Sequence, residues 1–149
     1  MKFETKIRKA RFVVSPFSAE QMQQIGQVAA DSIIARIKRG ENVQDASSKA
    51  LKPGRNGKKG YPEMKVARGR APIRDWYFRG LTLGSLKVKS ADENRVTIGF
   101  VNPQADTIAH VNNLREKAFG ESPSDRRAVN AAVTASLKQY RVVRFAKSA

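Results

Sequence analysis

The side chains that most often carry catalysis are scarce in this sequence. It has one histidine, His110, and no cysteine. Without a second histidine or a cysteine, His110 has nothing to complete a nucleophilic triad or a zinc site. We therefore interpret it as a hydrogen-bonded residue on a helix. The lack of cysteine also excludes disulfides and a thiolate nucleophile, which is compatible with assembly in a reducing cytoplasm.

Three other patterns resemble sites without meeting their requirements. Asp92 and Glu93 are adjacent in a predicted turn, so they are better interpreted as solvated turn residues than as paired catalytic carboxylates. Asp125 is better explained as an acid in the first turn of a helix. The glycines at 54, 57 and 60 lack the G-x-x-x-x-G-K-[ST] pattern and the preceding strand of a phosphate-binding loop. The sequence therefore predicts no enzyme, no metal and no cofactor.

Positive charge is the strongest signal in the sequence. The chain of 149 residues has 29 Lys and Arg against 13 Asp and Glu, a formal net charge of +16 at pH 7. Such an excess indicates contact with a polyanion or with an acidic protein face. Much of it falls in the N-terminal strand, in residues 49–74 and in the last dozen residues.

Residues 41–72 are rich in Gly and Pro and have no periodicity of helix or strand. With little apolar surface to offset the entropy of ordering, they predict a long basic loop that is mobile in the free protein. The alternative is a loop that is merely solvated. The candidate contacts with a polyanion or an acidic neighbour are Lys52, Arg55, Lys58, Lys59, Arg68 and Arg70, with Trp76 and Tyr77 as apolar anchors.

Trp76 and Tyr77 belong to an aromatic cluster that ends at Phe78. Such a cluster can stack on nucleic-acid bases, but it more often lies in a core or anchors a subunit interface. Asp75, directly before it, can cap a short helical turn that runs through Leu83.

The clearest element is an amphipathic helix at about 19–39. Ser18 and Gln21 form a capping box, and Gly40 is suited to end the helix. The apolar positions recur at helical spacing on one face, at Met22, Ile25, Ala29, Ile33 and Ile37. Before this helix, residues 1–15 predict a basic strand or extended arm.

Alternation of apolar and basic residues predicts an antiparallel hairpin at about 85–101, with one buried and one basic face. Two further helices follow. The first opens at Asn102-Pro103, can end at Gly120, and has Ile108, Val111, Leu114 and Ala118 on its apolar side. The second opens at Ser122-Pro123 and runs to about residue 140, which leaves the tail 141–149 as a short strand or an arm.

Together these elements predict one α+β domain, in which the long N-terminal helix packs on the small sheet. The single domain, 1–149, would carry the basic N-terminal arm (1–15), the basic loop (41–72) and the C-terminal tail (141–149). No apolar run approaches the roughly 18 residues of a spanning helix, and the first residues lack the apolar stretch of a signal peptide. We therefore expect a protein of the cytoplasmic side.

The order of several short motifs resembles a known family. Residues 73–86, IRDWYFRGLTLGSL, are similar to the "L-x-D/x-T-G-x-L-x-x-S-[IL]" segment of tailed-phage neck and tail-completion (virion morphogenesis) proteins. Upstream, residues 50–53 with Lys65 and Gly69 resemble the "P-L…K…G" loop of that family. Downstream, residues 98–100 and 108–110 resemble its "V-G…Y-A-x-x-H" segment.

A fourth motif completes the series. Arg115 and residues 119–125 resemble the "R-x-F-L-G-L-S-x-x-D" helix start of these proteins. Each motif alone is weak, but they run in the family's order across about residues 17–140. The motifs leave open whether the relative is a head–tail connector or a tail-completion subunit.

The resemblance implies a structural virion protein with no catalytic site, located in the phage neck and assembled in the host cytoplasm. Its partners would be copies of itself in a ring, the portal or adaptor, and tail proteins. Double-stranded DNA would pass through the ring, with non-specific contact in the channel, and no membrane would be involved. The alternative that the composition supports equally well is a basic nucleic-acid-binding module of a ribosome- or nucleoid-associated type.

Overall fold

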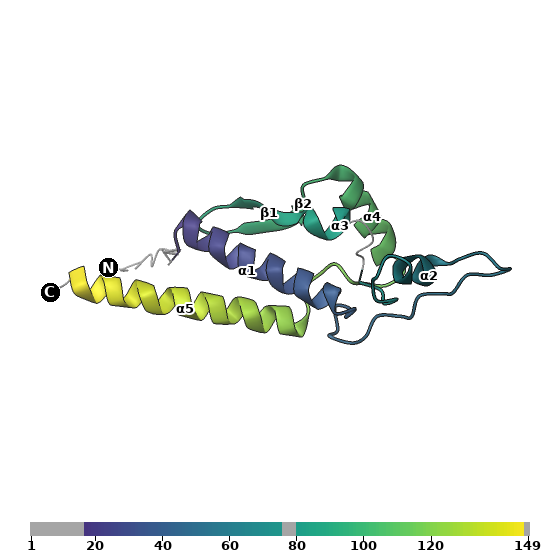
Figure 1. Cartoon of the computed structure of the whole chain (residues 1–149). Helices are drawn as coiled ribbons and strands as arrows, with labels where there is room; N and C mark the ends of the chain where they lie inside the picture. Colours follow the sequence, from purple (N-terminus) through teal and green to yellow (C-terminus); the bar gives the residue numbers. More distant parts are fainter. Residues whose placement is uncertain (1–16, 76–79, 148–149) are drawn as a thin grey trace, which may run out of the picture.

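The computed structural model describes residues 17–75 and 80–147 and shows an α+β fold, as expected (Figure 1). A long helix, α1, lies lengthwise between a two-stranded antiparallel hairpin and a second long helix, α5 (Figure 1). The elements in chain order are α1 (Ala19–Lys38), α2 (Tyr61–Val66), α3 (Leu81–Gly84), β1 (Leu86–Ala91), β2 (Val96–Phe100), α4 (Pro103–Asn113) and α5 (Pro123–Lys147).

Helix α1 begins where its capping residues place it. The Ser18 hydroxyl accepts a hydrogen bond from the Gln21 amide at 3.1 Å, and the Gln21 side chain accepts one from the Ser18 amide at 2.9 Å. This pair of bonds confirms the predicted capping box, which satisfies amides that the helix itself leaves unpaired. Ile25, Ala30 and Ile37 are buried along the helix.

The hairpin packs directly on α1 through a glycine. A Cβ atom placed on Gly26 would lie 2.4 Å from Cγ2 of Val96 and 2.9 Å from Cγ2 of Val88, closer than real Cβ contacts. Val88 and Val96 come from the two strands, whose register pairs Leu86 with Phe100 and has an irregularity between Val88 and Ser90. The missing side chain therefore lets the helix approach the sheet.

Helix α5 is held to α1 by a buried ion pair. The guanidinium of Arg36 on α1 donates from Nε to Asp125 Oδ2 at 2.9 Å, and the side chains are 0% and 1% exposed. Arg36 also donates to the carbonyl oxygens of Glu41, Ala118 and Gly120. One side chain of α1 thus fixes both the start of α5 and the chain that leads to it.

The start of α5 is as predicted, because Ser122 and Asp125 form a reciprocal cap. The Asp125 amide donates to the Ser122 hydroxyl at 3.2 Å, and the Ser122 amide donates to the Asp125 carboxylate at 3.1 Å. The predicted tail was wrong for residues 141–147, since α5 continues to Lys147. The helix has no Gly or Pro beyond Pro123 to stop it.

Two predictions about the ends of α4 and α3 were also wrong. Helix α4 ends at Asn113 rather than near Gly120, because the Asn113 side chain accepts from the amides of Ala118 and Phe119 and turns the chain. Asp75 does not cap α3, which begins after Gly80; its carboxylate pairs instead with Lys65. Within the predicted loop 41–72 the structure adds one short helix, α2, which the sequence analysis did not predict.

Some predictions fall outside the described residues. These are the N-terminal arm, 1–15, and the aromatic anchors Trp76 and Tyr77. Of the helices that the structure does describe, none has the length and apolar character needed to cross a membrane.

Candidate interface: the basic arm and the adjoining cleft

Residues 41–72, which we call the basic arm, extend from the body of the molecule at the end opposite the start of α1 and the end of α5 (Figure 1). The base of the arm is bonded to the body. The Asp45 carboxylate accepts from the Ser124 hydroxyl at 2.5 Å and from the Ser124 amide at 2.8 Å. The hydroxyls of Ser124, and then of Ser122, hold the pKa of Asp45 below its ordinary value. The arm thus begins as a cap on α5.

A second attachment lies a few residues further on. Glu116 is almost buried, with a side chain 6% exposed, and both its carboxylate oxygens accept from the Lys49 amide, at 3.0 and 3.1 Å. Arg74 lies 3.7 Å from the same carboxylate and donates to the Lys49 carbonyl at 3.0 Å. The chain that runs into the arm, at Lys49, and the chain that leaves it, at Arg74, therefore meet at Glu116.

The tip of the arm is a tight reversal of the chain. Asn56 and Gly57 have φ angles of 55° and 71°, and the Lys58 amide donates to the Arg55 carbonyl at 3.1 Å. This is the geometry of a two-residue hairpin turn, for which Asn-Gly is a favoured pair. A Cβ on Gly54 would lie 1.8 Å from the Lys58 carbonyl oxygen, so the two limbs touch there. The glycines therefore build a turn.

Glu63 of α2 ties the tip to the rest of the arm. Its carboxylate accepts from the Gly54 amide at 3.1 Å. Its own backbone amide, and then the amide of Gly54, hold the pKa of Glu63 below its ordinary value. The charged carboxylate thus stabilises the folded arm.

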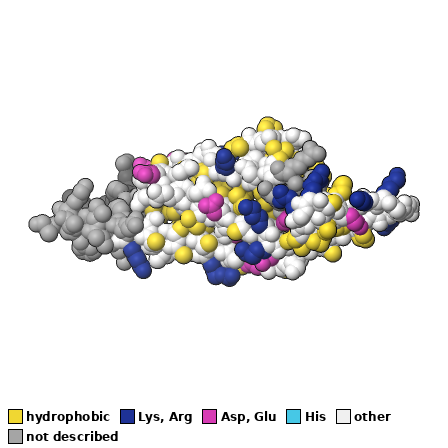
Figure 2. Space-filling model, in the orientation of Figure 1, with side chains coloured by type: hydrophobic (Ala, Val, Ile, Leu, Met, Phe, Trp, Pro, Cys, Tyr) yellow, Lys and Arg dark blue, Asp and Glu magenta, His cyan; other side chains and the backbone are white. Residues whose placement is uncertain are grey.

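Four of the six predicted contact cations lie within four residues of this turn, and we call them the tip cations. Lys52, Arg55, Lys58 and Lys59 are exposed, and their side chains make no hydrogen bond or ion pair with any residue that the structure describes. Figure 2 shows Lys and Arg side chains on the arm and on the adjoining half of the molecule, beside exposed apolar side chains. The tip is thus a cluster of unneutralised cations.

The other two predicted cations lie elsewhere. Arg68 and Arg70 follow α2, and each has an interaction within the molecule, so neither belongs with the tip cations. Trp76 and Tyr77 lie outside the described residues.

Lys65 is a cation that the sequence analysis counted with the loop but that the structure buries. Its side chain is 0% exposed, forms an ion pair with Asp75, and donates to the Ile73 carbonyl at 2.7 Å. The ammonium also lies 5.8 Å from the centroid of the Tyr61 ring. Lys65 therefore fixes α2 against residues 73–75, and it is not available to a partner.

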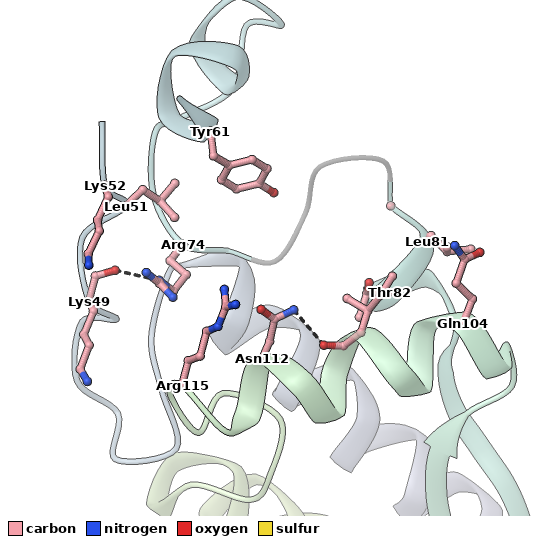
Figure 3. Close-up of a pocket in the computed structure, with 12 residues that line it drawn as sticks. Lys49, Leu51, Lys52, Tyr61, Arg74, Leu81, Thr82, Gln104, Asn112 and Arg115 are labelled. Carbon is pink, nitrogen blue, oxygen red and sulfur yellow. Dashed lines mark hydrogen bonds between the residues drawn. The ribbon is translucent and has the colours of Figure 1, made fainter. Parts of the chain in front are cut away.

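A cleft of about 970 Å³ opens between the arm, α3 and α4 (Figure 3). Its cations, Lys49, Lys52, Arg74 and Arg115, lie together on one side, while Leu81, Thr82 and Gln104 lie on the other (Figure 3). Leu51, Tyr61 and Ile108 add apolar lining. Burial raises the pKa of the Tyr61 phenol, which keeps its hydroxyl protonated.

The charge of this cleft is positive. None of the described residues that line it is acidic. Two carboxylates interact with residues of the lining without lining it themselves: Glu116 accepts from the Lys49 amide and faces Arg74, and Asp75 is paired with the buried Lys65. Lys49, Lys52 and Arg115 remain exposed.

Helix α4 presents apolar side chains to solvent beside the cleft. Ile108, Val111 and Leu114 are 37%, 45% and 76% exposed, whereas the residues that α4 buries are Ala105 and Ala109. The sequence placed Ile108, Val111, Leu114 and Ala118 on one apolar side; of these four, only Ala118, which lies beyond the end of α4, is buried. The small alanines face inward because they allow α4 to approach the core closely, and the larger residues remain outside.

The residues considered for catalysis have ordinary roles where the structure describes them. His110 lies on a helix, α4, as predicted, and is exposed, but its side chain makes no hydrogen bond with any residue that the structure describes, so the predicted hydrogen bond is not found there. The Asp92 carboxylate accepts from the amides of Asn94 and Arg95, both at 2.8 Å, which confirms its place in a turn. Within residues 17–75 and 80–147, no three His, Asp or Glu side chains are grouped so as to hold a metal.

Comparison of the chain with protein-family models, with curated proteins and with solved structures found no match. The arrangement of the arm, the cleft and α4 therefore has to be interpreted from its own chemistry.

Lys49, Arg74 and Arg115 are cleft residues that the sequence analysis did not select. The sequence did contain a sign that α4 lines the cleft with one face. Gln104, Ile108 and Asn112 are spaced by four residues, and Arg115 follows three residues later. No comparable spacing joins Lys49 to Arg74, since they are brought together by a direct hydrogen bond from Arg74 to the Lys49 carbonyl and by their shared contact with Glu116.

Proposed function

We propose that this chain is a structural protein of a tailed-phage virion, and that it forms a ring at the neck that joins or completes the head–tail connection. The motif order from residues 17 to 140 suggests this class. The α+β fold, with its long helix on a small sheet, agrees with what the resemblance implies.

The observation that carries the proposal is the exposed apolar face of α4 beside a positively charged cleft. Contiguous apolar side chains on a surface mark sites of protein contact. Interfaces between proteins combine an apolar centre with a polar or charged rim. Here the apolar centre is provided by Ile108, Val111 and Leu114, and the charged rim is provided by Lys49 and Arg115.

The shape of the chain is also suited to a ring. A closed ring needs two different surfaces on each subunit, since each copy contacts the next head to tail. The basic arm extends from one end of the body, opposite the start of α1 and the end of α5, so it is placed to reach a neighbouring subunit (Figure 1). In the ring, DNA would contact basic surfaces only in the channel.

A second candidate, a nucleic-acid-binding module, is favoured by the four tip cations that have no acidic partner among the described residues. It predicts that the free chain binds DNA or RNA with an affinity that falls steeply with salt. The slope of log K against log salt is about −0.9 for each phosphate neutralised, so four tip contacts give roughly −3 to −4. Absence of binding at moderate salt removes this candidate.

The experiment that tests the neck proposal is deletion of the coding sequence from the phage that carries it. Electron microscopy of the lysate should show filled heads and tails that are separate, or particles with unfinished tails. Supplying the chain in trans should restore joined particles. Normal numbers of infectious, complete virions without the chain would overturn the proposal.

A further inference from the structure

We propose that the cleft between the basic arm, α3 and α4 binds a short acidic segment, with one bulky apolar side chain, from a different protein. The assignment rests on the proposed function, because a neck subunit has protein neighbours that can supply such a segment. The cleft holds about 970 Å³, a volume suited to a few residues of an extended chain.

The division of the lining into two sides defines the occupant. The cations gather on one side, where Lys49 and Arg115 are exposed and not neutralised by any acid that lines the described cleft. Carboxylates placed there gain charge-assisted hydrogen bonds. Leu81, Ile108 and Tyr61 provide an apolar surface for one large side chain. A segment with both features would match both sides.

Nucleic acid fits this lining less well. A single strand binds by stacking its bases on aromatic side chains. Tyr61 is the sole aromatic residue among the described residues that line the cleft, and the rest of its apolar surface is aliphatic. A phosphate chain would satisfy the cations but would leave Leu81 and Ile108 uncovered.

A second copy of this chain is also a poor source of the segment. The chain has only 13 acidic residues. Several of those described, such as Asp45, Glu116 and Asp125, already accept hydrogen bonds within the molecule. At a net charge of +16, two copies repel one another unless other contacts overcome the repulsion. The occupant is therefore assigned to an acidic partner.

The test uses the full chain, labelled with ¹⁵N, and the probe peptide acetyl-Glu-Glu-Ser-Trp-Glu-Glu-amide, which has one bulky apolar side chain. The titration should shift the amide signals of Thr82, Ile108 and Asn112. Arg115→Gln and Lys49→Gln should each raise the Kd for the peptide about tenfold, because each removes one charge-assisted hydrogen bond. The matched control, Lys87→Gln, removes an exposed lysine of β1 and should change the Kd by less than about twofold.

Each contrary outcome identifies a different error. The assignment is overturned if the peptide does not bind, if a peptide with Gln in place of Glu binds equally well, or if Lys87→Gln weakens binding as much as Arg115→Gln. Tighter binding of a DNA oligonucleotide of equal charge to the same amides would assign the cleft to nucleic acid. Concentration-dependent shifts of these amides without peptide would assign it to a second copy. These results concern the cleft alone, whereas the deletion experiment tests the neck function separately.

Discussion

Replacement of Arg36 by methionine should destabilise this protein more than replacement of any exposed arginine. Arg36 is 0% exposed and donates to Asp125 and to the carbonyl oxygens of Glu41, Ala118 and Gly120. Methionine has a similar length but no donor. The substitution leaves Asp125 buried without its ionic partner, and leaves three carbonyl groups without the guanidinium.

Breaking a buried ion pair by removing one partner costs about 3–5 kcal/mol. Asp125 keeps two donors, the Ser32 hydroxyl at 2.7 Å and the Ser122 amide at 3.1 Å, so we expect the lower half of that range. In urea, with a slope of about 1–3 kcal/mol per molar, the unfolding midpoint should fall by roughly 2 M. Circular dichroism at 222 nm, which reports the helices, measures this midpoint.

Arg39→Met is the matched control, because Arg39 lies less than one turn further along the chain. Its ion pair with Glu41 is partly exposed, at 55% and 29%, so its loss should lower the free energy of unfolding by at most about 1 kcal/mol. Should Arg36→Met fail to fold, the milder Asp125→Asn gives the same comparison. Equal midpoints for Arg36→Met and Arg39→Met would refute the assignment of Arg36 as the link between α1 and α5.

Three further predictions test other contacts. Gly26→Ala should lower the free energy of unfolding by about 1–3 kcal/mol, because its Cβ would overlap Val96 and Val88, while Gly84→Ala, with no atom within 4 Å of the new Cβ, should not destabilise; urea denaturation compares them. The carboxyl of Glu63, followed by ¹³C NMR, should titrate below its ordinary pKa of about 4.3. Because the pKa of Glu63 is lower in the folded chain than in the unfolded chain, its carboxylate stabilises the fold above the unfolded-state pKa. This stabilisation is lost as the pH falls through the folded-state pKa, and Glu63→Gln should remove this part of the acid dependence. In amide exchange, the tip residues 55–59 should exchange fast in the free chain and slowly in the assembly, while the amides around the buried Lys65 should be protected in both; a tip equally protected in both states would contradict ordering on assembly.

The sequence was most informative where local chemistry decides the structure. The capping boxes at Ser18 and Ser122, the alternating strands around Val88 and Val96, and the apolar stripe of α1 each depend on neighbours within a few residues. These features predicted the α+β fold and the boundaries of α1 to within one residue.

The sequence was least informative where a distant partner decides the role of a residue. Arg36 looked like a cation at the end of a helix, but Asp125, 89 positions away, makes it part of the core. Lys65 is one of many cations in residues 41–72, but its ion pair with Asp75 and its hydrogen bond to the Ile73 carbonyl make it a buried structural residue. For α4, periodicity identified an apolar side but could not show that the alanines face the core and Leu114 faces solvent.

The candidate site was predicted in part for the same reason. The tip cations Lys52, Arg55, Lys58 and Lys59 could be selected because the sequence around them contains almost no acid. The cleft could not be predicted, since it exists only after Arg74 contacts both Lys49 and Glu116 and Arg115, just beyond α4, lies beside them on the same side.

The most direct test of the account is mass spectrometry of purified virions that carry either the wild-type chain or the variant Val111→Glu. Val111 lies on the exposed apolar face of α4, and Val28, 38% exposed on α1, provides the control Val28→Glu. If the chain is a neck protein that binds its neighbours through α4, the wild-type and Val28→Glu chains should be found in complete particles. The Val111→Glu chain should fold but should be absent from these particles. Absence of the wild-type chain from virions, or normal incorporation of Val111→Glu, would contradict the account.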